Sequence, residues 1–285
     1  MLTEADLEER KKGIGGSEIA AVLGLDRFAG PLDVWLAKTA GWTKEVTPDM
    51  ERGSFLEDGI ANWYAHREGV KVHAVGPMVH RALPWARCTP DRTAVLRDGY
   101  ALSNRLVSIK CPRWDRETPE GHILQLQWED AVLCSAPAQA AALVPTMHLV
   151  SLADGDLKVV PVERDVELQR WMLDYAGAWW AKHVVGGVPP PLDGSEGASR
   201  WLKKRFPKNT APERPATLDE TVALLELREA EAARDEADKV FEAKAQKVKE
   251  AVGEAGGIES DAVGRATWKA DKNGKRTFKT HWSKQ

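Results

Sequence analysis

The spacing of apolar and polar residues divides the first two thirds of the chain into helical and extended stretches. Apolar residues recur at helical spacing in five stretches, and elsewhere the pattern shortens to alternating runs bounded by turn signals. The predicted helices are residues 3–23 (interrupted at Gly13–Ser17), 31–40, 54–68, 120–135 and about 164–183. The predicted strands lie within residues 70–110 and on both sides of the turn Asp154-Gly155.

This order of elements predicts a mixed α/β domain with one central sheet. The first strands cluster as a meander before a crossover helix, which argues against a doubly wound fold. We place this domain at residues 1–205 and a proline-containing linker at 206–216. Residues 217–285 are expected to form a helical arm followed by a β hairpin, because Asn273-Gly274 is a strong hairpin turn signal.

Composition limits the class of protein. The chain has 285 residues, of which 43% are hydrophobic and 29% charged, enough apolar residues for a core. No apolar run approaches the roughly 18 residues of a membrane span, and the polar first residues do not resemble a signal peptide. The three cysteines form no CxxC pair, so neither a disulfide framework nor a zinc ribbon is expected. These features predict a cytoplasmic protein without a membrane partner.

Charge is unevenly distributed along the chain. The formal net charge is −3, yet residues 265–285 hold seven basic residues and a single acidic one, Asp271. A second basic segment, residues 200–208, contains no acidic residue. Both segments can contact a DNA backbone, and the alternative is an ordinary solvated face.

The strongest candidate for chemistry is Asp91 in Thr89-Pro90-Asp91, followed by Lys110 at the end of a strand. Side chains alternate along a strand, so Ser108 and Lys110 share one face, which Asp91 can reach if its own strand pairs antiparallel. A carboxylate and an ammonium group at one sheet edge can hold a divalent cation and orient a water. Glu57 can supply a second acidic ligand. The alternative is a turn aspartate beside an ordinary edge-strand lysine.

Six motifs, in order and at matching spacing over roughly residues 8–185, add a family resemblance. The sequence resembles the YqaJ-type viral recombinase nucleases and phage lambda exonuclease, within the PD-(D/E)xK superfamily. This resemblance implies a restriction-endonuclease-like core, with a central mixed sheet flanked by helices. The motifs are RKKGIGGSEIAAVLGL, PLDVWLAKT, GSFLEDGIANWY, CTPD, SIKCP and HILQLQ.

The resemblance also implies roles for individual residues. Glu57, Asp91, Lys110 and Gln125 match the family's active-site positions, and the main-chain carbonyl of Ile109 matches a further metal ligand. The implied metal is Mg²⁺ or Mn²⁺, held by Glu57, Asp91 and that carbonyl.

A second group of residues matches the positions that bind a 5′-terminal phosphate. These are Arg10 and Ser17, with Arg116 expected to join them. The glycines of Gly13–Ser17 allow close approach of an anion, and free N–H groups at the following helix favour phosphate. The alternative is a glycine-rich connection in which Ser17 caps the helix.

One position departs from the family pattern. Two residues before the lysine the family carries an acid, and here Ser108 stands there. A hydroxyl is a weak ligand for a hard cation, so metal affinity and activity should fall unless another group compensates. Three interpretations stand: an inactivated nuclease, compensation by Glu129 one helical turn beyond Gln125, or a site that works with Glu57 and Asp91 alone. A solvated helix carboxylate is the alternative for Glu129.

The resemblance therefore predicts a metal-dependent DNA exonuclease that digests linear double-stranded DNA from 5′ to 3′. It also implies phage-type recombination in a bacterial host, a phage or prophage origin, a ring-shaped homo-oligomer and a single-strand annealing protein as partner. The alternative function, favoured by Ser108, is a catalytically dead DNA-binding or scaffold homologue with the same fold.

Overall fold

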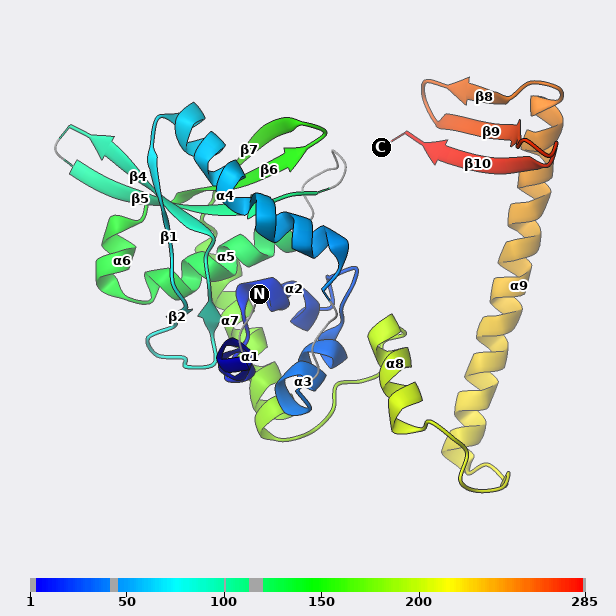
Figure 1. The fold of residues 1–285 in the computed structure, drawn as a ribbon. Helices are drawn as coiled ribbons and strands as arrows, with labels where there is room; N and C mark the ends of the chain where they lie inside the picture. Colours follow the sequence, from blue (N-terminus) through cyan, green and yellow to red (C-terminus); the bar gives the residue numbers. More distant parts are fainter. Residues whose placement is uncertain (1–3, 42–45, 100, 113–119, 284–285) are drawn as a thin grey trace. The chain divides into compact units, whose positions relative to one another are not determined.

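The computed structural model describes residues 4–41, 46–99, 101–112 and 120–283 and divides the chain into two compact units, Met1–Lys208 and Asn209–Gln285 (Figure 1). The helices of the first unit are α1 (Glu4–Lys11), η1 (Gly16–Glu18), α2 (Ile19–Val22), α3 (Pro31–Thr39), α4 (Pro48–Glu68), α5 (Glu120–Cys134), α6 (Pro137–Ala142), α7 (Val166–Trp179), η2 (Trp180–Val185) and α8 (Glu196–Arg205). Its strands are β1 (Lys71–Ala74), β2 (Met78–Val79), β3 (Arg87–Cys88), β4 (Arg92–Asp98), β5 (Ala101–Lys110), β6 (Thr146–Ala153) and β7 (Asp156–Glu163).

Within the described residues, the centre of the first unit is a five-stranded mixed sheet in the order β1-β4-β5-β6-β7. The pair β5 and β6 is parallel and the other neighbours are antiparallel. A parallel pair needs a long crossover connection, and the segment that contains α5 provides it. The predicted mixed α/β core, with a central sheet flanked by helices, is confirmed.

Helices cover both faces of this sheet (Figure 1). On one face Ile60 and Tyr64 of α4 pack against Val107 and Ile109 of β5. On the other face, residues of α5 pack against alternate positions of the same strand, including Leu106. Odd and even positions of β5 therefore face different helices, as strand alternation requires. Ser108 and Lys110 lie on the α5 side.

The helix α5 also anchors a second core formed with α2 and α7. Trp128 is fully buried there, packs on Trp85 with ring centroids 6.1 Å apart, and donates from Nε1 to the carbonyl of Arg87 at 2.9 Å. On the same helix Asp130 accepts two bonds from the Arg164 guanidinium, at 2.6 and 2.8 Å. Both contacts fix the rotation of α5, and with it the side chains that α5 presents to the sheet edge.

Several details differ from the sequence prediction. The helix expected at 54–68 begins at Pro48, because Thr47 caps it and accepts a bond from the N–H of Met50. Of the apolar residues on this helix, Ile60 and Tyr64 are buried, whereas Phe55 and Trp63 are exposed. The short helices α6 and α8 were not predicted.

The second unit consists of a long helix, α9 (Leu218–Val252), and a three-stranded sheet of β8 (Gly257–Ser260), β9 (Gly264–Ala270) and β10 (Arg276–Trp282) in the order β10-β9-β8. The predicted arm and hairpin are present as α9 and the β9–β10 pair. The strand β8, which pairs antiparallel with β9, was not predicted. No helix in the described part of the chain is long and apolar enough to span a membrane.

Trp128→Ala should destabilise the first unit by about 4 kcal/mol, because it removes a fully buried aromatic side chain and leaves a cavity between α5 and its neighbours. Urea denaturation followed by circular dichroism measures the effect. Trp171→Ala is the matched control, since Trp171 is 50% exposed on α7 and its loss should change stability by less than about 1 kcal/mol. Equal effects of the two substitutions would contradict this description of the core.

Candidate active site

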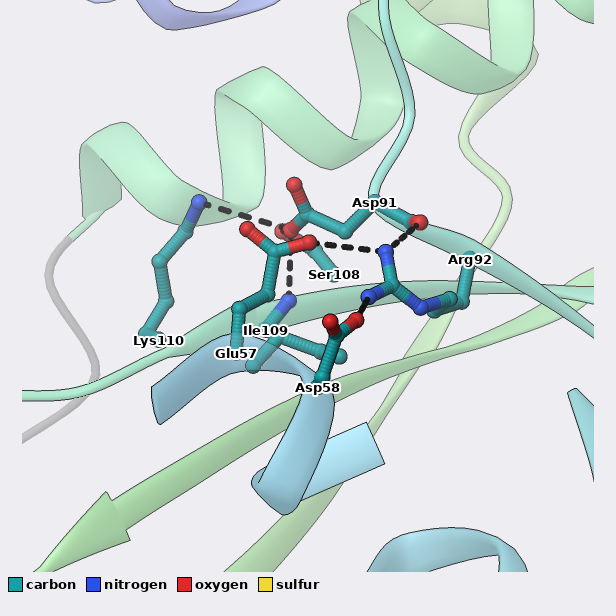
Figure 2. A network of polar contacts seen from close by, with 7 residues as sticks. All are labelled: Glu57, Asp58, Asp91, Arg92, Ser108, Ile109 and Lys110. Carbon is teal, nitrogen blue, oxygen red and sulfur yellow. Dashed lines mark hydrogen bonds and ion pairs between the residues drawn. The ribbon is translucent and has the colours of Figure 1, made fainter. Parts of the chain in front are cut away.

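The candidate site lies where β4 begins and its pairing with β5 ends. The last paired residues are Arg92 and Val107, so the N–H of Ile109 finds no main-chain partner in β4. Asp91 replaces that partner: its Oδ2 accepts from the Ile109 N–H at 2.7 Å and from the Ser108 hydroxyl at 3.1 Å (Figure 2). The Asp91 carboxylate is thereby fixed on the face of β5 that carries Ser108 and Lys110.

Three polar side chains continue from this carboxylate toward α5. The Lys110 Nζ lies 4.0 Å from Asp91 Oδ2 and donates to Gln125 Oε1 at 3.2 Å. Gln125 in turn donates from Nε2 to Glu129 Oε1 at 2.7 Å. The one-turn spacing of Gln125 and Glu129 on α5 places both on the side that faces the sheet edge. The structure therefore brings Asp91, Ser108, Lys110, Gln125 and Glu129 into one connected group.

Glu129 is deeply buried rather than a solvated helix carboxylate. Its side chain is 1% exposed, and within the described residues its Oε2 has no hydrogen-bond partner. Burial raises the pKa of Glu129 to about 8; the nearby Asp91 carboxylate adds to the shift, while Lys110 and the Gln125 hydrogen bond oppose it. A buried acid with one unpaired oxygen is uncommon in a stable core and marks a candidate functional group.

The buried position of Glu129 depends on a glycine. Gly16 in η1 approaches so closely that a Cβ atom at this residue would lie 2.7 Å from Glu129 Oε1 and 2.9 Å from its Cγ. A side chain at position 16 would displace the carboxylate. The glycine-rich segment thus has a packing role against α5.

Glu57 joins the site through a residue that the sequence analysis did not single out. Arg92 donates from Nη1 to Glu57 Oε1 at 2.7 Å and to the main-chain carbonyl of Asp91 at 2.5 Å, and from Nη2 to Asp58 (Figure 2). Arg92 faces α4, whereas Asp91 faces α5. The contacts of Arg92 could have been anticipated only from its position next to Asp91 and from its burial.

The donor chemistry of the site suits a hard divalent cation, although the carboxylates are held by other partners. Within the described stretches, no three His, Cys, Asp or Glu side chains are grouped as a metal site. Asp91 nevertheless supplies carboxylate oxygen, and the unpaired buried Oε2 of Glu129 would be satisfied by a cation. The Ile109 carbonyl is expected on the Asp91 side too, since the N–H and C=O of a strand residue point to the same edge.

Two of the predicted phosphate-binding residues, Arg10 and Ser17, lie on α1 and η1 of the first unit. Ser17 is exposed in η1, directly after Gly16. Arg10 is exposed near the end of α1, and its carbonyl accepts from Lys38 Nζ, which also binds Glu18 of η1. In the part of the chain that the structure describes, neither side chain contacts Asp91 or Lys110. Arg116 lies outside the described residues.

The site lies in a part of the chain that matches a known protein family. Residues 7–140, a range that spans Glu57, Asp91, Lys110, Gln125 and Glu129, match the YqaJ-like viral recombinase domain. This segment, residues 7–140, is therefore similar to that family and is called the YqaJ-like domain below. It is also 32% identical over 206 residues to the uncharacterized protein YqaJ of Bacillus subtilis (strain 168). That alignment spans 70% of this chain and 62% of the relative's length.

The fold of the chain is also similar to that of a solved structure. The structure resembles the crystal structure of an alkaline exonuclease (LHK-Exo) from Laribacter hongkongensis, with a TM-score of 0.50 and 20% sequence identity. The match covers 71% of this chain and 97% of that chain. At this level of identity the likeness establishes a common fold.

The pKa of Glu129 predicts how the stability of the YqaJ-like domain depends on pH. Its carboxyl keeps a proton up to about pH 8 in the folded chain, against an ordinary value of 4.5. Between these values the folded state binds more protons than the unfolded state, so stability falls as pH rises through this window. Glu129→Gln removes the titration. In EDTA, its stability relative to the unmodified protein should rise by more than about 1 kcal/mol between pH 5 and pH 8.

Urea denaturation at the two pH values measures this difference. Glu167→Gln is the control, because Glu167 is exposed on α7 and its substitution should have the same small effect at both values. An effect of Glu129→Gln that does not change with pH would show that Glu129 is ionised throughout.

Proposed function

We propose that the chain is a metal-dependent exonuclease that digests linear double-stranded DNA from 5′ to 3′. The observation that carries this proposal is the connected group of Asp91, Lys110, Gln125 and Glu129 at the end of β5, with a buried acid where the sequence lacks the usual one. The match to the YqaJ-like viral recombinase domain and the fold shared with an alkaline exonuclease support it.

Asp91, the Ile109 carbonyl and Glu129 would hold the cation, Mg²⁺ or Mn²⁺, with Glu57 as a further carboxylate. Glu129 takes the place of the acid that Ser108 does not provide. A bound divalent cation supplies positive charge to the scissile phosphate and makes a water more acidic. Because Glu129 is fully buried beside Asp91, it should lose its proton only when a cation offsets the two negative charges.

The remaining residues act on water and phosphate. The Lys110 ammonium, placed between Asp91 and Gln125, would orient the attacking water and offset negative charge on the phosphate. Gln125 can accept from Lys110 and donate to Glu129 at once, so it holds both side chains in place. The Ser108 hydroxyl keeps Asp91 in position by donating to its Oδ2.

The substrate end would be held by the N-terminal part of the domain. Ser17 lies next to Gly16, which packs on Glu129, so a phosphate bound at η1 would lie close to the carboxylate group. Arg10, and Arg116 by resemblance, would add positive charge to this 5′-phosphate site. The ring-shaped homo-oligomer and the annealing partner stay predictions of the family resemblance.

A second candidate function is a DNA-binding or scaffold homologue without catalysis. Ser108 favours it, because its hydroxyl is a weak ligand for a hard cation and donates its hydrogen bond to Asp91. The two functions differ in one property: whether the chain forms product from DNA when a divalent cation is added.

Incubation with 5′-phosphorylated linear duplex and Mg²⁺ or Mn²⁺ should yield mononucleotides, released first from a 5′ label and not from a 3′ label. Asp91→Asn and Glu129→Gln should each lower the rate by at least about a hundredfold, because each removes a carboxylate from the cation. Affinity for duplex in EDTA should stay unchanged in both variants. Glu167→Gln on the exposed face of α7 serves as the control.

Ser108→Glu separates the two functions. If Glu129 has replaced the usual acid, the unmodified protein is active and Ser108→Glu does not increase its rate of DNA digestion. Activity of Ser108→Glu alone would establish a disarmed nuclease. If neither protein cuts while both bind DNA, the exonuclease proposal is wrong.

A further inference from the structure

Arg92 connects two parts of the site that are far apart in sequence. It is the first residue of β4, paired with Ala74 of β1 and Val107 of β5, and its side chain is 11% exposed. Strand alternation directs it toward α4, whereas its neighbour Asp91 faces α5. Its guanidinium is nevertheless bonded to the main chain of Asp91 as well as to both acids on α4.

The arrangement of the Arg92 hydrogen bonds determines where the Glu57 carboxylate lies. The same nitrogen, Nη1, binds Glu57 Oε1 and the Asp91 carbonyl, so the position of Glu57 is set relative to Asp91 rather than to α4 alone. The second nitrogen binds Asp58, which fixes the plane of the guanidinium. Among the described residues, the hydrogen bond to Arg92 uses one carboxylate oxygen of Glu57, Oε1. Figure 2 shows the Arg92 guanidinium contacting the Glu57 carboxylate and the main-chain carbonyl of Asp91.

We infer that Arg92 is a positioning residue that holds Glu57 as a carboxylate for the divalent cation, an inference that rests on the proposed function. A surface ion pair would not need a buried arginine, and Asp58 alone would satisfy its charge. The planar fork of arginine is required, because a lysine cannot bind two carboxylates and a carbonyl from fixed directions.

Arg92→Lys tests this role without changing the net charge. Mn²⁺ alone, titrated into metal-free full-length protein by calorimetry, should bind about tenfold more weakly to the variant. Glu57→Gln should weaken binding too, and adding Arg92→Lys to Glu57→Gln should have no further effect, since Arg92 acts through Glu57. Arg67→Lys is the matched control: Arg67 lies on α4, bonds the Leu157 carbonyl, and should leave the Mn²⁺ affinity unchanged.

The outcomes distinguish this inference from the proposed function. Absence of Mn²⁺ binding by the unmodified protein overturns both. Equal Mn²⁺ affinities of the unmodified protein and Arg92→Lys, or additive effects with Glu57→Gln, overturn the role of Arg92 alone. If thermal melting shows that Arg92→Lys does not fold, Asp58→Ala loosens the same guanidinium from an exposed position. It should weaken Mn²⁺ binding about threefold, and an unchanged affinity overturns the inference.

An independent observation concerns the second unit. The helix α9 covers one face of its sheet, where Ala266 is buried and Arg276 bonds the carbonyls of Gly253 and Ala255. By alternation and register the opposite face, here called the outer sheet face, carries polar and basic side chains. It consists of Arg265, Thr267, Lys269, Thr277, Lys279 and His281, with Gly257 and one acid, Glu259, from β8.

The basic side chains of the outer sheet face are not used within the unit. Arg265, Lys269 and Lys279 are exposed, and among the described residues none of them forms an ion pair. In the cross-strand register Lys269 faces Thr277 and Lys279 faces Thr267, whereas Arg265 lies between His281 of β10 and Glu259 of β8. Alternating cations and hydroxyl donors on a flat, exposed surface suit a row of phosphates.

The geometry points to the outer sheet face as a second contact surface for duplex DNA, independent of the catalytic chemistry. A duplex dumbbell closed by hairpins has no ends for the exonuclease site, so its binding isolates this surface. In EDTA, the double variant Lys269→Glu/Lys279→Glu should bind a fluorescent dumbbell at least about tenfold more weakly. The slope of log affinity against log salt should fall by about 2.

The matched control reverses two charges elsewhere in the same unit. Lys244 and Lys247 are exposed on α9, and Lys244→Glu/Lys247→Glu should keep most of the affinity and the salt slope. Equal losses from both double variants would mean that overall charge, and not the outer sheet face, governs binding. No loss from Lys269→Glu/Lys279→Glu would also overturn the proposal. Circular dichroism verifies that both variants keep the second unit folded.

Discussion

The site depends on one carboxylate that completes the hydrogen bonding of a strand after its neighbour has ended. Asp91 accepts the Ile109 N–H that β4 no longer reaches, and it accepts the Ser108 hydroxyl as well. A buried N–H without a partner is costly, so the fold itself holds Asp91 in place. The Lys110 ammonium and the Arg92 guanidinium then find this residue at a defined position. The Asp91 carboxylate therefore both completes the hydrogen bonding of the fold and takes part in the proposed chemistry.

The electrostatics of the site follow from how many acids are buried around Asp91. Burial is the main reason that the pKa of Glu129 is raised to about 8, and the nearby Asp91 carboxylate adds to the shift. Lys110 opposes this shift, and Arg92 pairs with Glu57. Without a cation the group is balanced by one proton and two basic side chains. A divalent cation would replace that proton, which links metal binding to proton release.

Much of the fold could be predicted from the sequence, because the period of apolar residues distinguishes helices from strands. The pattern predicted the helix that carries Gln125 and the strand that ends at Lys110. The strand β8 was missed because its four residues, Gly257–Ser260, are short and largely exposed. Phe55 has helical spacing with Ile60, yet it is exposed, because spacing alone cannot distinguish an exposed aromatic residue from a core one.

Within the site, only the neighbours that are close in sequence could be predicted. Alternation along a strand suffices to place Ser108 and Lys110 together, and helical spacing places Glu129 beside Gln125. The burial of Glu129 is different, because it arises from the approach of Gly16, more than a hundred residues earlier in the chain. Arg92 was missed for a related reason: its partners Glu57 and Asp58 belong to a helix that only the tertiary fold brings to it.

These contacts also explain why Ser108 and Glu129 belong together. Ser108 donates a hydrogen bond to Asp91 at 3.1 Å, so a carboxylate at that position would put a second negative charge against Asp91. With Glu129 already buried nearby, three acids would then lie close together beside Lys110. Repulsion among them would destabilise the metal-free fold. Under the proposed function, a neutral hydroxyl on the strand and an acid on the helix would keep the number of carboxylates constant, with one of them on α5. The serine is therefore a compatible partner of the buried glutamate, and the loss of an acid at position 108 does not by itself imply the loss of a metal site.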